Sequence, residues 1–229
     1  MRTIDFRSFV LATAALVAAA GTLAAQERPN GLLNVLEVQQ LVARGEPADN
    51  GRLAAHFSAL ADRYTGEAKR HRTMSQSFIG NPSRNLGLGM SAHCKRLADL
   101  NTQEATTVRE LVAYHEKLAV GAPATLPLDG ARFQGGAGAP EPNEKALNAL
   151  AAKASTPADH KALEEYFVTL AKRYTRAADE HVTLSATYRG TRIAQASAIQ
   201  DHLARLARDS AGEAAAAADM HKQLATIAR

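Results

Sequence analysis

The chain has 229 residues, with 27 Lys and Arg against 23 Asp and Glu, and a formal net charge of +4. The charges are mixed along the chain, without a basic block interleaved with aromatic residues, and this pattern argues against nucleic-acid binding. Cys94 is the single cysteine, so an intrachain disulfide is excluded and stability must come from helix packing. We expect Cys94 to be a small buried hydrophobic side chain.

The N-terminal residues have the pattern of an export signal. Arg2 and Arg7 flank a basic start, residues 8–23 are apolar, and the small residues Ala24 and Ala25 follow. We expect residues 1–25 to be a signal peptide cleaved near Ala25, because an apolar stretch of about 16 residues is short for a bilayer span. The mature chain is then predicted to be periplasmic, with no membrane span of its own.

Two helical hairpins are predicted after the signal, at 26–119 and 143–229. Each has a short amphipathic segment (32–42 and 146–152) and a long helix that opens at a proline, Pro47 or Pro157. Thr156 with Asp159 indicates an N-terminal capping arrangement. The long helices are expected to end at the turns 80–82 and 189–190, and the second helices to span about 89–119 and 194–227. Residues 120–142 are rich in Gly, Pro and Ala and are predicted to be a linker.

The two units are similar in sequence. Residues 47–71 align with residues 157–181 without a gap, and twelve of the 25 aligned positions are identical. Apolar residues spaced three and four apart form a seam on each long helix. The fold class is therefore predicted to be all-α, most economically an antiparallel four-helix bundle of two repeated hairpins with short extra helices. Two separate hairpins, each with its own partner, are the alternative.

Histidines stand on this apolar seam. His71 aligns with His181 and His93 with His202, and each lies a similar distance from its hairpin turn. If both turns lie at one end of the bundle, these four side chains share a layer that could bind Zn, Cu or Ni, or a b-type haem. Met74 and Cys94 would be auxiliary ligands. The plainer alternative is that the rings are structural and fix helix register through hydrogen bonds.

Two glutamates also fall on the seam of the second helices. Glu104 and Glu213 align with each other and are expected near the level of Tyr64 and Tyr174. A buried carboxylate needs a donor, so a Tyr–Glu hydrogen bond is predicted at each site. No metalloprotease, serine-hydrolase, c-type haem or phosphate-loop motif occurs in the chain, and we expect a protein that is not an enzyme.

Three functional hypotheses follow. The first is a periplasmic binding or interaction module, which could engage another envelope protein. The second is a metal- or haem-binding bundle that uses the four seam histidines. The third is an acid-responsive protein, because buried neutral histidines must become charged as the pH falls.

A resemblance supports the expected class. The run Pro47-Ala48-Asp49 with Leu53, the pattern F-x-x-L-A-x-R-Y over 57–64 and the spaced histidines resemble uncharacterised exported helical-repeat proteins of Gram-negative bacteria. The likeness covers both units. It implies no activity and no site residues.

Overall fold

A computed structural model describes residues 32–81, 84–120 and 144–227. The predicted signal peptide, and the predicted linker from residue 121 onward, lie outside these described residues.

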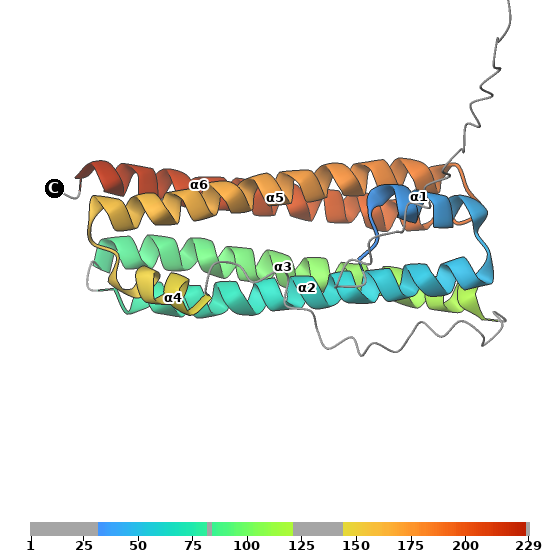
Figure 1. Ribbon diagram of the computed structural model, residues 1–229, viewed down its shortest axis with the longest axis horizontal. Coiled ribbons are helices and arrows are strands. Elements are labelled where there is room, and N and C mark those ends of the chain that lie inside the picture. Colours follow the sequence, from blue (N-terminus) through green and yellow to red (C-terminus); the bar gives the residue numbers. More distant parts are fainter. Residues whose placement is uncertain (1–31, 82–83, 121–143, 228–229) are drawn as a thin grey trace, which may run out of the picture.

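The protein is all-α, as predicted. The two hairpins are α2 (Pro47–Ile79) with α3 (Arg84–Ala119), and α5 (Pro157–Arg189) with α6 (Ala196–Ile227). Each hairpin is preceded by a short helix, α1 (Val35–Arg44) or α4 (Glu144–Lys153). The four long helices form the antiparallel bundle that the seam pattern indicates (Figure 1).

The helix boundaries follow from local chemistry. Pro47 and Pro157 occupy the first turns of α2 and α5, and the predicted Thr156–Asp159 capping box is confirmed. A second capping box, between Asn34 and Glu37, starts α1, and Gly45 ends α1 with a φ of 66° that favours glycine. α3 starts at residue 84, five residues earlier than expected, because the helix tolerates the glycines that suggested a longer turn.

Only one side of the bundle is closed by direct contact between the hairpins. α3 packs against α6, whereas no Cα atom of α2 lies within 8 Å of a Cα atom of α5. α1 contacts both α2 and α5 near one end, and α4 contacts both near the other end (Figure 1). The two short helices therefore keep α2 and α5 apart.

The two hairpin turns lie at opposite ends of the bundle (Figure 1). At one end, Asn81 after α2 donates to the carbonyls of Ala151 and Ala154 beside the start of α5, both at 3.1 Å. At the other end, Gln39 of α1 donates to Thr187 near the end of α5. The condition for a shared layer of four histidines, with both turns at one end, is therefore not met.

The core has two apolar halves. One contains Phe57, Leu111 and Leu203 and lies on the α1 side, and the other contains Phe78, Leu97 and Phe167 and lies on the α4 side. Between them, all four long helices contribute buried polar side chains, namely Glu67, His71, Asn101, Glu104, His181 and Ser210. This polar belt is the part of the interior where chemistry other than apolar packing is available.

The opposite placement of the turns can be measured directly. We expect spin labels at Ile79→Cys and Arg189→Cys to be separated by roughly the length of α5, about 45–50 Å. Both sites are exposed, and the buried Cys94 makes the unsubstituted chain the labelling control. A distance below about 25 Å, measured by pulsed electron–electron double resonance, would contradict the placement of the turns at opposite ends.

Candidate ligand-binding pocket

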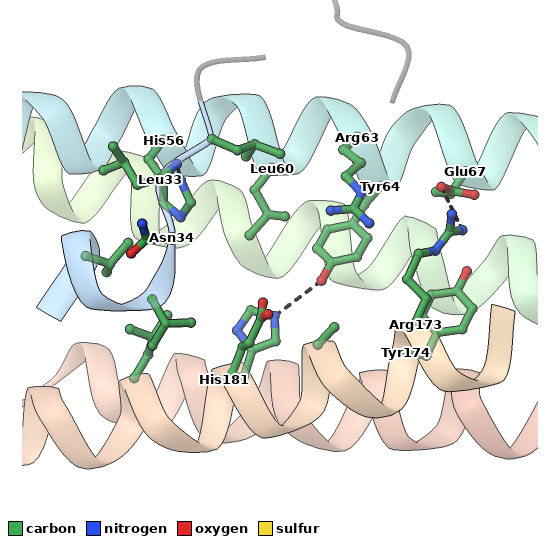
Figure 2. Close-up of a pocket in the computed structure, with 16 residues that line it drawn as sticks. Leu33, Asn34, His56, Leu60, Arg63, Tyr64, Glu67, Arg173, Tyr174 and His181 are labelled. Carbon is green, nitrogen blue, oxygen red and sulfur yellow. Dashed lines mark hydrogen bonds and ion pairs between the residues drawn. The ribbon is translucent and has the colours of Figure 1, made fainter. Parts of the chain in front are cut away.

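A pocket of about 360 Å³ lies in the gap that α1 and α4 hold open between α2 and α5. Leucines from residues 32–33, α2 and α5 line it on the α1 side. Towards the middle of the bundle the lining becomes polar, with two tyrosines, two arginines and two glutamates (Figure 2). A small cavity with an apolar part and a few fixed polar groups is typical of small-molecule sites.

Tyr64 of α2 and His181 of α5 meet across the pocket. The Tyr64 hydroxyl lies 3.2 Å from Nε2 of His181 (Figure 2). Nδ1 of His181 lies 2.7 Å from the side-chain oxygen Oε1 of Gln200. Because this oxygen can only accept a hydrogen bond, Nδ1 carries the proton, and Nε2 accepts a hydrogen bond from Tyr64. Burial lowers the pKa of His181 to about 4, against the opposing effect of Gln200, and the ring is neutral at pH 7.

The aligned residues form a reciprocal pair. The Tyr174 hydroxyl accepts a 2.7 Å hydrogen bond from the amide of Asn101 and lies 3.4 Å from Nε2 of His71. Burial, followed by the charges of Arg173 and Arg70, lowers the pKa of His71 to about 3. Each hairpin thus contributes one tyrosine and one histidine to the contacts that cross between α2 and α5.

His56 presents a further polar group to the pocket. Its Nδ1 accepts a 3.0 Å hydrogen bond from the backbone N–H of Leu33, so Nε2 carries the proton of the neutral ring. Burial, with smaller effects from His181 and His115, lowers the pKa of His56 to about 4. The ring lines the pocket (Figure 2), where its Nε2–H group is a hydrogen-bond donor.

The arginines in and beside the pocket differ in whether they form ion pairs. Glu67 accepts from Arg70 at 2.8 Å and from Arg173 at 2.9 Å, so one carboxylate holds two guanidinium groups. Arg63, one helical turn before Glu67, also lines the pocket and is half-buried. Within the described parts of the chain, Arg63 has neither an ion-pair partner nor a side-chain hydrogen bond.

Glu104 of α3 is fully buried behind the two tyrosines. Neither carboxylate oxygen has a hydrogen-bond partner of normal geometry, although the Ser210 hydroxyl faces the group. Burial raises the pKa of Glu104 to about 8, against the effect of Ser210. The side chain is therefore mostly protonated and uncharged at neutral pH, which is how a carboxyl group is tolerated at this depth.

The predicted layer of four histidines does not form. Because the turns lie at opposite ends, His71 and His93 belong to one half of the bundle and His181 and His202 to the other. His202 is exposed on α6. Among the residues that the structure describes, no three His, Cys, Asp or Glu side chains form a group that could hold a metal ion. The metal and haem hypothesis therefore loses the geometry on which it rested.

The other predicted site residues have structural roles. His93 contacts Glu213, which also accepts from Arg96 at 2.7 Å. Burial acts to raise the pKa of Glu213, but the hydrogen bonds from Arg96 and His93 outweigh it, and the pKa is lowered. The predicted auxiliary ligands Met74 and Cys94 are fully buried in the apolar core, as expected for Cys94.

The predicted Tyr–Glu hydrogen bonds are wrong. The hydroxyl of Tyr64 is engaged with His181 and that of Tyr174 with Asn101 and His71, whereas Glu213 pairs with His93 and Arg96. The physical reason is that neutral imidazole and amide groups satisfy the buried tyrosines without bringing a charge into the core.

Sequence reasoning missed the pocket residues His56, Arg63 and Arg173. His56 aligns with Tyr166 and not with another histidine, so the repeat gives no signal for it. The two arginines align with each other, and each directly precedes a seam tyrosine. That juxtaposition was the available signal.

Comparison with known proteins adds no identification. No protein-family model, no curated protein and no solved structure matches the chain. None of the described helices combines the length and the apolar character that a membrane crossing requires. The fold and the site define an all-α bundle with a polar-lined pocket between two of its helices.

The protonated state of Glu104 predicts an unusual pH dependence. Its folded pKa of about 8 exceeds the ordinary value of 4.5, so folding retains a proton that the unfolded chain releases, and stability falls as the pH rises through this window. We expect Glu104→Gln to gain stability relative to the wild type by about 1.4 kcal/mol per pH unit between about pH 5.5 and 7.5 in urea unfolding.

Glu213, which aligns with Glu104 in the repeat, supplies the control. The pKa of Glu213 is lowered, so its contribution to stability is complete above the ordinary value of 4.5. Glu213→Gln should therefore be less stable than the wild type by a constant amount between about pH 5.5 and 7.5. Parallel stability curves for the wild type and Glu104→Gln would show that Glu104 is ionised in the folded protein.

Proposed function

We propose that this protein is an exported binding module of the cell envelope, and that its ligand site is the pocket between α2 and α5. The observation that carries the proposal is the pocket of about 360 Å³, with apolar side chains at one end and orientated polar groups at the other. Export to the periplasm is part of the proposal and rests on the basic, apolar and small-residue pattern of residues 1–25.

The architecture suits binding because the pocket does not need to be created by the ligand. α1 and α4 keep α2 and α5 apart, and the Tyr64–His181 contact crosses the gap with both side chains already in place. A preformed site loses less conformational entropy when a ligand binds.

Filling the pocket should abolish binding. Ala177 lines it from α5, and we expect Ala177→Trp to occupy the space with its indole ring. A thermal-shift screen of small amphipathic compounds should find ligands that raise the melting temperature of the wild type but not of this variant, since a ligand at a hundred times its Kd adds about 2.7 kcal/mol.

The control is Ala216→Trp, the same substitution at an exposed position of α6. It should respond to ligands as the wild type does. A screen without hits, or hits that stabilise Ala177→Trp equally, would contradict the assignment of the pocket.

A second candidate function is a response to acid. It is favoured by the buried histidines: burial lowers the pKa of His56, His115 and His181 to about 4. It lowers the pKa of His71 and His221 to about 3, with contributions from neighbouring charges. Since the unfolded values lie near 6.5, stability is fully present above about pH 6.5 and is lost as the pH falls towards 4.

His71 and His221 are the best positions for a test, because each has a ring nitrogen without a hydrogen bond. His71 faces Tyr174 and the charges of Arg70 and Arg173. We expect His71→Leu/His221→Leu to shift the midpoint of acid unfolding to lower pH, by about half a unit or more, in far-UV circular dichroism.

His221 lies against His160, Phe78 and Phe167, so a leucine there replaces a ring packed among rings. His202→Leu is the matched control, because His202 is exposed. It should leave the midpoint unchanged. Equal midpoints for the double variant and the wild type would reject the acid-responsive function.

A further inference from the structure

The aligned arginines of the two hairpins lie in different surroundings. Arg173 donates to Glu67 across the gap between α5 and α2 (Figure 2). Arg63 points into the same pocket from α2, yet the described part of the chain offers it no ion-pair partner. A half-buried guanidinium that lacks a counter-ion retains unused capacity to bind an anion.

One substitution between the units accounts for the difference. The residue of α5 that aligns with Glu67 is Ala177, and Ala177 also lines the pocket. Arg173 therefore finds a carboxylate on the opposite helix, whereas the corresponding position on the helix opposite Arg63 holds only a methyl group. The space that a second carboxylate would take is part of the cavity.

The charges around the pocket leave one positive charge in excess. Arg63, Arg70 and Arg173 are positive, and the negative groups are Glu67, which is shared by two arginines, and Glu180, which is exposed at the rim. Glu104 lies close enough to feel the charge of Arg63, but its raised pKa leaves it mostly uncharged at neutral pH. A single excess cation matches a ligand with one negative charge better than a dianion.

The other end of the pocket is apolar. Leu33, Leu60 and Leu184 line it on the α1 side, and His56 adds a single Nε2–H donor to this end, one helical turn further from Arg63 than Leu60 is (Figure 2). The pocket is thus polarised along its length, and this polarity sets the direction in which an amphipathic molecule would bind.

We infer that the pocket binds a small monocarboxylate, with its carboxylate on Arg63 and its apolar body directed towards Leu33, Leu60 and Leu184. The inference rests on the proposed function of the pocket and names the ligand class. The planar guanidinium can hold a carboxylate through two parallel hydrogen bonds.

Three probes of the same chain length separate the relevant chemistries: octanoate, octanamide and octyl phosphate, titrated calorimetrically into the full chain at pH 7.5. Octanoate should bind at least about tenfold more tightly than octanamide, because a charged hydrogen-bonded contact is worth about 1.5–3 kcal/mol. Octyl phosphate should bind more weakly than octanoate. Phosphate binding that equals or exceeds carboxylate binding would overturn the assignment of a monocarboxylate.

The repeat supplies a sharp variant. Ala177→Glu places opposite Arg63 the carboxylate that Glu67 offers Arg173, and it should lower octanoate affinity at least about tenfold. Ala177→Gln is its uncharged isostere and should retain more than a third of the wild-type affinity. Arg63→Gln should weaken octanoate binding as Ala177→Glu does. The control is Arg176→Gln, which removes an exposed arginine next to Ala177 on α5 and should bind octanoate as the wild type does.

Failure of the inference is distinguishable from failure of the pocket. Equal affinities for octanoate and octanamide that are both lost in Ala177→Trp would overturn the carboxylate assignment and leave the pocket as the site. Octanoate binding that survives Ala177→Trp would overturn both. Unchanged octanoate affinity in Arg63→Gln, or no octanoate binding to the wild type, would also overturn the inference.

Discussion

The reciprocal contacts between tyrosine and neutral histidine are the interaction on which the rest of the structure depends. Tyr64 bonds to His181, and Tyr174 lies against His71, so each hairpin places one ring of each kind against the other hairpin. These contacts require the hairpins to run with their turns at opposite ends, because only then do positions 64 and 181, which do not align in the repeat, come to the same level. They also require uncharged imidazole, since the burial of a charged ring without a partner is costly.

The pocket is a consequence of the same arrangement. With α3 and α6 in direct contact and α2 and α5 held apart by α1 and α4, the interior opens on one side only. Because the two hairpins are similar in sequence, they would be expected to line the two sides of the pocket in the same way. Glu67 of α2 aligns with Ala177 of α5, however, and this difference leaves Arg63 without the counter-ion that Arg173 has. A binding site can thus arise from a near-symmetric scaffold through the loss of one carboxylate.

Much of the fold could be predicted from local signals. The prolines at 47 and 157, the Thr156 cap and the seam spacing define α2 and α5 almost to the residue. The direction of the second hairpin could not be predicted, because a connection of more than twenty residues can span the bundle either way. The site depends on that direction: His56 is orientated by the backbone of Leu33, and Arg63 is recognised as unpaired only when α5 lies opposite. The prediction placed His71 and His181 correctly in the interior, but it was wrong for His202, which is exposed on α6.

The most direct test of the central claim is the protonation and tautomer state of His181 in solution, read from long-range ¹H–¹⁵N correlation spectra at pH 7. The structure predicts a neutral ring with the proton on Nδ1 and Nε2 accepting from Tyr64. The exposed His202 serves as the internal reference for a histidine outside the core. A charged His181 ring, or a ring that carries its proton on Nε2, would contradict the account.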